Sequence, residues 1–340
     1  MELRLLVSVK KGGKEMNDIL FKHIDFAYAN KSIFNDLSLS IPLSGYGTAL
    51  MGKSGIGKTT LIKLIIGMLT PSDGEIILPE KTIFSYIPQN PVLFEHLSMR
   101  ENIEYLKHSK EYAKHFENKR INELVELLDI QDLINKNISV EDLSGGQKQM
   151  IMLLRAMSVK PTILVLDEPL TGLDQITKSK IMNSLVELCS DYGTHLLYIT
   201  HHLDEAKYLC ENILYFLQEK DYVGVNSISL NELKFPKHIE IAESIFYNDM
   251  VVLPYIKEDN SKEDIEYLCC FKNEIVFTQN GEYEVSKVTN TLNGYLIEIK
   301  GWQSNLLLLK KDFKEVIKKG MRFKNNGSYA AYDKNGLIIE

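Results

Sequence analysis

The chain has 340 residues, of which 44% are hydrophobic and 25% are charged, and its formal net charge is −7. This length exceeds what one compact core of ordinary size requires, so we expect two domains. A net negative charge provides no basic field that would attract nucleic acid, and a nucleic-acid partner is therefore not expected.

The N-terminal end and the cysteines give few signs of function. An apolar run at residues 3–9 is short and meets Lys10 and Lys11 at once, so we interpret residues 1–19 as a leader of unclear role, either a strand or a mis-set start, rather than a signal peptide. The four cysteines have neither C-x-x-C nor zinc-type spacing, which favours reduced thiols. No run approaches the roughly 18 apolar residues that cross a bilayer, so a membrane role would need a partner.

From about residue 20 to 226, short apolar runs alternate with longer helical patterns, which predicts a largely parallel sheet covered by helices. The first motif follows an apolar strand at residues 49–51 and precedes an apolar helix. It comprises Gly52, Lys53, Ser54, Gly55, Ile56, Gly57, Lys58 and Thr59, followed by Thr60. A glycine-rich turn is the alternative, but the strand-to-helix context favours a phosphate loop, whose backbone N–H groups surround phosphate oxygens.

In such a loop Lys58 reaches the β- and γ-phosphates of ATP and Thr59 binds Mg²⁺. The next apolar strand, residues 83–87, leads to Gln89. A helical insert is then expected between about residues 98 and 138, because Ser98 and Glu101 form a capping-box pattern and apolar residues recur at helical spacing from 121 to 128.

Two further apolar strands end in polar side chains. Residues 163–166 read as a strand buried on both faces, and Asp167 and Glu168 follow it. Asp167 is placed to hold Mg²⁺ through water, and Glu168 to orient and deprotonate the attacking water, although acidic strand ends also serve as helix caps. The strand at residues 195–200 leads to His201, beside which His202 is expected to be solvated.

Gln89 or His201 alone would more often be an ordinary loop residue or a hydrogen-bonded histidine. Four strands that each deliver a phosphate, metal or water ligand to one edge of a sheet are harder to explain by packing. Between these strands, Ser144, Gly145, Gly146 and Gln147 precede a helix and offer a second anion site at its N-terminus, with a simple helix cap as the alternative.

The last part of the chain has a different pattern. Residues 227–240 contain Pro236 and several charges and are interpreted as a linker. Residues 241–340 are rich in Tyr, Val, Ile and Phe and contain four Asn-Gly pairs, the strongest hairpin signal, so we expect a small antiparallel barrel or sandwich, interrupted by one helix at residues 311–319.

Residues 143–147 resemble the signature motif of the ABC-type ATPases, and every diagnostic motif of that family occurs in its order between about residues 20 and 215. The resemblance implies an α/β P-loop ATPase domain with a helical subdomain. It also implies that Gln89 is the Q-loop glutamine and a metal ligand, that Asp174 belongs to the D-loop, and that His201 contacts the γ-phosphate. Tyr28 matches the aromatic residue that stacks on adenine, although a core aromatic is an equal alternative.

The resemblance further implies a head-to-tail dimer, most simply a homodimer, in which the signature of one copy faces the ATP of the other. The C-terminal region is similar to the TOBE-type domains of importer ATPases, which implies a peripheral protein on the cytoplasmic membrane face, docked on permease subunits and served by a solute-binding protein. We expect import of a small ion, oxyanion or polyamine. An exporter ATPase, a non-transport ABC ATPase, and a tail that only dimerises or senses a ligand remain the alternatives.

Overall fold

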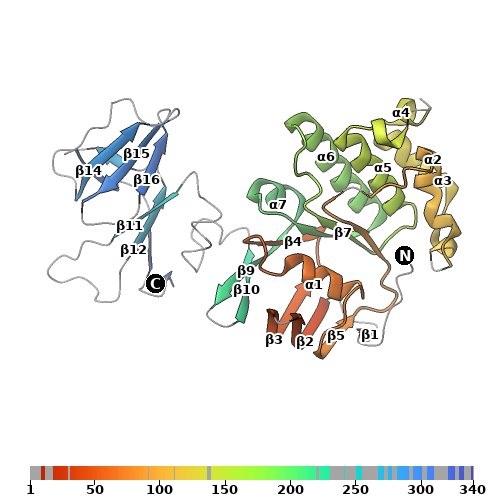
Figure 1. The fold of residues 1–340 in the computed structure, drawn as a ribbon, viewed down its shortest axis with the longest axis horizontal. Coiled ribbons are helices and arrows are strands. Elements are labelled where there is room, and N and C mark those ends of the chain that lie inside the picture. Colours follow the sequence, from red (N-terminus) through yellow and green to blue (C-terminus); the bar gives the residue numbers. More distant parts are fainter. Residues whose placement is uncertain are drawn as a thin grey trace. The chain divides into compact units, whose positions relative to one another are not determined.

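The computed structural model describes residues 9–11, 18–29, 31–90, 92–110, 112–135, 139–219, 222–229 and 241, and the segments 250–254, 267–271, 275–277, 282–290, 294–300, 305–309, 321–325, 329–332 and 338–339. The chain divides into two compact units, residues 1–230 and 231–340, which are described separately (Figure 1).

A six-stranded sheet, in the order β10-β9-β4-β8-β7-β6, forms the centre of the first unit. Its strands are β4 (Gly47–Gly52), β6 (Phe84–Ile87), β7 (Ile163–Asp167), β8 (His195–Ile199), β9 (Asn212–Glu219) and β10 (Tyr222–Ser229). All neighbours in the sheet are parallel except β9 and β10. Every residue of β4, β7 and β8 is buried, which explains their nearly continuous apolar sequences.

A second sheet of the first unit has the order β1-β5-β2-β3. Its strands are β1 (Val9–Lys11), β2 (Asp18–Tyr28), β3 (Lys31–Pro42) and β5 (Asp73–Leu78). The range 1–19, expected as a separate leader, thus contributes β1 and the first residues of β2 to this sheet, while residues 1–8 and 12–17 lie outside the described residues.

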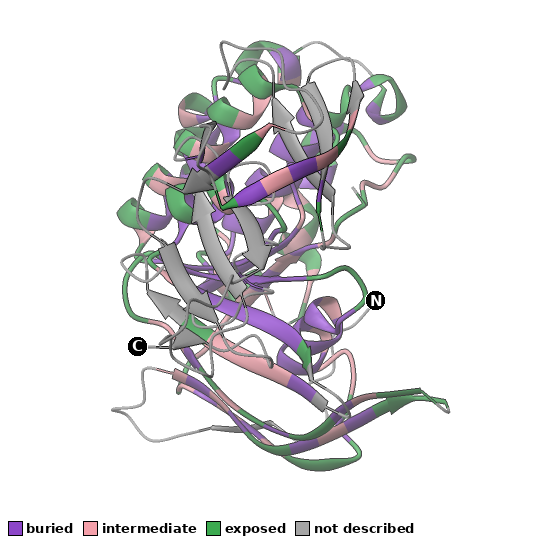
Figure 2. Cartoon of the chain, turned by 90° about the vertical axis from the view of Figure 1, so that its left-hand side faces the viewer, coloured by how far each residue is buried: buried purple, intermediate pink, exposed green. Residues whose placement is uncertain are grey.

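Helix α1 (Lys58–Ile65) packs between the two sheets and is buried on most of its surface. Its Leu61 and Ile65 belong to one hydrophobic cluster with Phe21 of β2 and with Val165 and Leu197 of the six-stranded sheet. Figure 2 shows these buried segments in purple. Because the last residues of the predicted phosphate loop, Lys58 and Thr59, form the start of α1, the core of the unit fixes the position of that loop.

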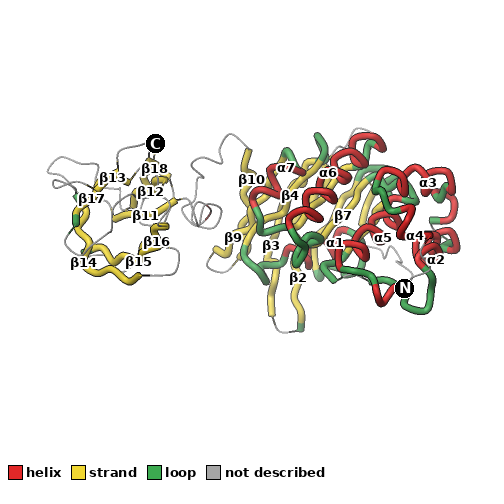
Figure 3. The backbone as a smooth tube through the Cα atoms, turned by 90° about the horizontal axis from the view of Figure 1, so that it is seen from above, coloured by secondary structure: helices red, strands yellow, loops and turns green. Residues whose placement is uncertain are grey.

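The remaining helices of the first unit are α2 (Met99–Glu104), α3 (Asn118–Leu127), α4 (Gln131–Asn135), α5 (Gly145–Met157), α6 (Gln175–Tyr192) and α7 (Leu203–Leu209), with short 3-10 helices at Tyr105–His108, Ala113–His115 and Val140–Asp142. Helices α2 to α5 gather at one end of the unit (Figure 3). The predicted capping box is confirmed, because Ser98 and Glu101 satisfy each other's backbone N–H groups at the start of α2.

The second unit contains two antiparallel sheets, in the orders β11-β12-β18-β19 and β13-β17-β14-β15-β16. Its strands are β11 (Met250–Pro254), β12 (Tyr267–Phe271), β13 (Ile275–Phe277), β14 (Tyr283–Asn290), β15 (Gly294–Ile299), β16 (Asn305–Leu309), β17 (Arg322–Asn325), β18 (Tyr329–Tyr332) and β19 (Ile338–Ile339).

In the sequence, the Asn293-Gly294 pair leads into β15, the antiparallel partner of β14, and the Asn335-Gly336 pair falls between the antiparallel partners β18 and β19. The expected helix at residues 311–319 lies outside the described residues, as do residues 230–240 of the expected linker, whose first residues 227–229 complete β10. Within the described ranges, no helix has the length and apolar character needed to cross a bilayer.

Candidate functional site

Strands β4, β8, β7 and β6 are parallel neighbours, so their carboxyl ends share one edge of the sheet. The phosphate loop follows β4, Gln89 follows β6, Glu168 follows β7 and His201 follows β8. The predicted convergence of four strand ends is therefore confirmed. Ligands of open α/β sheets bind at such carboxyl ends, which makes this edge the candidate site.

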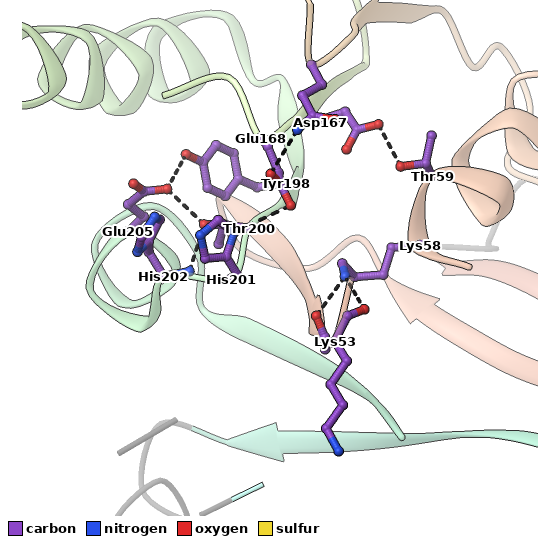
Figure 4. A network of polar contacts seen from close by, with 12 residues as sticks. Lys53, Lys58, Thr59, Asp167, Glu168, Tyr198, Thr200, His201, His202 and Glu205 are labelled. Carbon is purple, nitrogen blue, oxygen red and sulfur yellow. Dashed lines mark hydrogen bonds and ion pairs between the residues drawn. The ribbon is translucent and has the colours of Figure 1, made fainter. Parts of the chain in front are cut away.

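The phosphate loop closes around the side chain of Lys58, which is only 6% exposed. Its Nζ atom donates to the carbonyl oxygens of Gly52 at 2.7 Å and Lys53 at 3.0 Å (Figure 4). Burial lowers the pKa of Lys58, and the nearby carboxylates Glu168 and Asp167 oppose that shift. The loop therefore presents a cation in a partly dehydrated position, where it interacts strongly with an anion.

Gly52 adopts a φ of 139°, and a Cβ atom there would lie 2.6 Å from the carbonyl oxygen of Phe216. Only glycine fits this position, because the backbone of β9 passes so close and L-residues avoid that conformation. Gly57, with a φ of 116°, precedes the first turn of α1. These two glycines let the chain turn from β4 into α1 with its N–H groups facing the loop.

Asp167 ends β7 and is 3% exposed. Its Oδ2 accepts a hydrogen bond from Thr59 Oγ1 at 2.9 Å and one from the Tyr86 hydroxyl at 3.4 Å. Burial raises the pKa of Asp167, and the hydrogen bond from Thr59 opposes the shift. A hydroxyl and a carboxylate oxygen side by side form the oxygen-only ligand pair that suits Mg²⁺.

Glu168 has a φ of 47°, a left-handed conformation that is rare for a residue with a side chain. Its amide donates to the Ile199 carbonyl oxygen at 3.0 Å, which holds this turn against β8. The carboxylate accepts a hydrogen bond from Gln89 Nε2 at 3.2 Å and lies 3.4 Å from Nδ1 of His201. The structure thus brings together Glu168, predicted to act on the attacking water, with the Q-loop glutamine Gln89 and with His201, predicted to contact the γ-phosphate.

Tyr28, at the end of β2, lies at the rim of this site. Its hydroxyl accepts a hydrogen bond from Thr60 Oγ1 at 3.4 Å, its ring packs edge-on against Phe26, and 42% of the residue is exposed. An exposed aromatic ring beside the first turn of α1 can accept a planar base by stacking.

The predicted second anion site lies in a separate cluster. Ser144 and Gln147 form a capping box at the start of α5, in which each side chain bonds to the other's backbone N–H. Asp174 caps α6 by accepting from the amides of Ile176 and Thr177. The hydrogen bond from the Thr177 hydroxyl, together with these amide bonds, lowers the pKa of Asp174. A Cβ atom on Gly146 would lie 2.5 Å from Thr177 Cγ2, so the two helix starts pack closely together.

The hydrogen bonds shown for Ser144 and Gln147 join them to each other and not to the phosphate loop. The sequence-predicted residues therefore form two groups in one chain, one around Lys58 and Glu168 and the other around Ser144 and Asp174.

Two residues of the site were missed at the level of sequence. In the sequence Tyr86 is only one residue of an apolar strand, although its hydroxyl donates to Asp167. Glu205 resembled an ordinary acidic residue in a first helical turn, yet it is 7% exposed and holds Thr200 beside His201. The one available signal was that Glu205 follows a strand-end histidine by only four positions.

Comparison with known proteins agrees with this geometry. The ABC transporter family matches residues 34–171. The molybdate/tungstate import ATP-binding protein WtpC of Methanocaldococcus jannaschii is 34% identical over 256 residues, which are 71% of this chain and 83% of that protein. The chain belongs to the ABC transporter family.

Within that family the chain is an ATP-binding ATPase, as the family match and the relative named as an ATP-binding protein show. The Fe(3+) ions import ATP-binding protein FbpC 1 of Pectobacterium atrosepticum is 32% identical over 209 residues, which are 59% of this chain and 58% of that protein. A solved structure of an ATP-binding subunit of an ABC transporter matches this ABC ATPase with a TM-score of 0.52 and 24% identity, covering 64% of this chain and 92% of that one, which supports the fold.

Proposed function

We propose that this ABC ATPase hydrolyses Mg-ATP at the edge formed by β4, β6, β7 and β8, and that it powers the import of a small ion, oxyanion or polyamine through a separate permease. The observation that carries the proposal is the carboxylate of Glu168, which lies between Gln89 and His201 at the same sheet edge as the phosphate loop.

In this proposal the backbone N–H groups from Gly52 to Thr60 and the ammonium of Lys58 bind the β- and γ-phosphates, while Tyr28 stacks on adenine. Glu168 orients the attacking water and accepts its proton. Gln89 and His201 hold the Glu168 carboxylate from two sides, and His201 reaches the γ-phosphate.

Thr59, Asp167 and Gln89 are the residues that would hold Mg²⁺; Thr59 bonds to Asp167, and Gln89 reaches the adjacent Glu168. The Thr59 hydroxyl and Asp167 carboxylate oxygens lie 2.9 Å apart, and such oxygen ligands suit this hard cation, which also keeps several waters. When bound, Mg²⁺ would neutralise negative charge on the phosphate oxygens.

We further propose that two copies assemble head to tail, so that the group around Ser144 and Asp174 of one copy completes the site of the other. Ser144 and Gly145 are exposed at the N-terminus of α5, where the helix dipole favours an anion. Because these residues lack a bond to the phosphate loop of their own chain, a partner's nucleotide is the ligand that fits.

Import is favoured over export because both relatives compared above are named as import ATP-binding proteins, one for molybdate or tungstate and one for Fe(3+) ions. The proposed location is the cytoplasmic face of a membrane, through permease subunits and, on the other side, a solute-binding protein. The TOBE-like character of residues 241–340 remains a proposal that rests on their antiparallel strands.

The proposal is tested with the full chain purified together with its membrane partner and placed in vesicles. ATP hydrolysis and inward movement of molybdate, tungstate, ferric iron or spermidine are measured in parallel. One of these solutes should stimulate ATP hydrolysis and should itself move inward. Glu168→Gln should lower hydrolysis about 100-fold or more while ATP binding persists, because the amide cannot accept the water proton.

Glu187→Gln, which makes the same chemical change at an exposed position of α6, serves as the control and should hydrolyse ATP normally. Normal hydrolysis by the Glu168 variant would disprove its role as the base. Outward solute movement would support an exporter instead, and hydrolysis that no membrane partner affects would support a non-transport ATPase.

A further inference from the structure

A buried carboxylate lies directly behind the histidine of the site. Glu205 is in the first turn of α7 and is 7% exposed. Its Oε2 accepts hydrogen bonds from the Tyr198 hydroxyl at 2.9 Å and from Thr200 Oγ1 at 2.8 Å (Figure 4). Its Oε1 lies 3.2 Å from Nζ of Lys178 on α6. A charge so far from water is costly unless such partners compensate it.

The carboxylate determines the direction of the Thr200 hydroxyl. The Glu205 carboxylate, paired with the Lys178 ammonium, can only accept hydrogen bonds. The hydroxyl hydrogen of Thr200 must therefore point at Glu205. The lone pairs of the Thr200 oxygen are then free, and the backbone N–H of His202 donates to that oxygen at 3.0 Å. A continuous chain of hydrogen bonds therefore runs from Glu205 through Thr200 to the amide of His202.

These hydrogen bonds hold the backbone on both sides of His201, the residue whose ring approaches Glu168. His201 stands between Thr200 and His202, and its side chain is 51% exposed. The contacts shown for its ring are Nδ1 to the Glu168 carboxylate at 3.4 Å and the neighbouring His202 ring, with centroids 4.0 Å apart. Because solvent surrounds half of this side chain, the backbone on its two sides largely determines where the imidazole lies.

We propose that Glu205 is a positioning residue, which acts through the Thr200 hydroxyl to fix the backbone around His201 and so directs the imidazole toward Glu168. The inference rests on the proposed role of His201 in ATP hydrolysis. Through Lys178, the same carboxylate also ties the first turn of α6, which Asp174 caps, to the end of β8.

A matched pair of variants separates positioning from simple support of the core. Tyr198 lies in β8 and Thr200 directly follows that strand; both are at most 1% exposed, and both donate to Oε2 of Glu205. Only Thr200 passes the interaction on to the amide of His202. Tyr198→Phe and Thr200→Val each remove one hydroxyl and keep the shape of the side chain.

We expect Thr200→Val to lower kcat of the full chain about tenfold, with KM for ATP changed by less than about threefold, because ATP still binds but the imidazole is misplaced. Thr200→Ser retains the hydroxyl and should restore kcat to within about threefold of wild type. Tyr198→Phe should lower the melting temperature yet keep kcat within about twofold.

Equal losses of kcat in Thr200→Val and Tyr198→Phe, in proportion to the folded fraction, would show a purely structural role and overturn the proposal. A fourth variant, His201→Ala, separates the proposed role of His201 from the proposed positioning role of Glu205. If it hydrolyses ATP as wild type does, the proposed role of His201 fails, and the positioning role fails with it. If it loses activity while Thr200→Val keeps full activity, only the positioning role is wrong.

Discussion

His195, the first residue of β8, is a buried neutral imidazole and not a member of the site. It is 6% exposed, and its ring nitrogens lie 3.3 Å from the Gly45 carbonyl oxygen and 3.2 Å from Thr48 Oγ1. Burial lowers its pKa to about 4, and the Gly45 carbonyl only partly opposes this shift. The residue therefore links the protonation of one side chain to the stability of the central sheet.

The sign of that linkage follows from the lowered pKa. Below pH 6.5 the unfolded chain binds a proton at His195, whereas the folded chain keeps this imidazole neutral. The contribution of His195 to stability is therefore complete above pH 6.5 and falls as the pH drops toward 4. The loss should be on the order of 3 kcal/mol at pH 4. Urea unfolding of wild type and His195→Gln at several pH values checks this.

The variant should be less stable at pH 7 but should lose less stability on acidification. His108→Gln, at an exposed position, is the control and should keep the wild-type dependence on pH. The explanation is wrong if the slope of His195→Gln equals that of wild type between pH 6.5 and 4.5.

Asn102 connects α2 to the segment that follows Gln89. Its side chain is fully buried, its Oδ1 accepts from the amide of Phe94 at 2.8 Å, and its Nδ2 lies within 3.1 Å of the carbonyl oxygens of Phe94, Leu97 and Ser98. Arg155 of α5 reaches the same segment, donating to the Val92 carbonyl oxygen at 2.7 Å. Two helices therefore hold the chain between Gln89 and α2.

Replacing Asn102 with alanine should destabilise the first unit by about 2 kcal/mol, because it leaves the part-buried Phe94 amide and Leu97 carbonyl group without the side chain that bonds to them. Denaturant unfolding measures this cost. Asn135→Ala removes an exposed amide that accepts a single hydrogen bond from Gln131, and it should change stability by less than about 0.5 kcal/mol. Equal costs at the two positions would contradict the explanation.

At the scale of the whole molecule, all residues of the proposed nucleotide site lie in the unit formed by residues 1–230. The boundary expected from sequence, residue 226, falls inside β10, where residues 227–229 pair with Leu214, Ile213 and Asn212 of β9. A fragment of residues 1–230 should therefore bind a fluorescent ATP analogue within about threefold of the full chain.

A fragment that ends at residue 226 loses those three strand pairs and should unfold at a lower temperature than the 1–230 fragment. Lys58→Ala in the longer fragment provides the negative control for nucleotide binding. Loss of binding in the 1–230 fragment itself would show that residues 231–340 are needed for the site.

The motifs of this protein could be predicted from sequence because local chemistry determines them. A phosphate loop needs particular glycines between a strand and a helix, and buried strands need nearly continuous apolar residues, so Gly52, Asp167 and Glu168 stand out without coordinates. The largely parallel sheet followed from the same alternation of patterns, and the shared edge for Gln89 and His201 came with it, whereas the order of the strands came only from the structure.

Tertiary structure alone decided which side chains support those motifs. Tyr86 and Glu205 look like an ordinary strand aromatic and an ordinary helix-start acid, and only the packing of β6 beside β7, and of α7 against β8, turns one toward Asp167 and the other toward Thr200. The left-handed backbone of Glu168 was equally unpredictable, since it depends on a hydrogen bond to Ile199 in a neighbouring strand. Contacts between residues distant in sequence leave no local pattern, because they arise only when the sheet assembles.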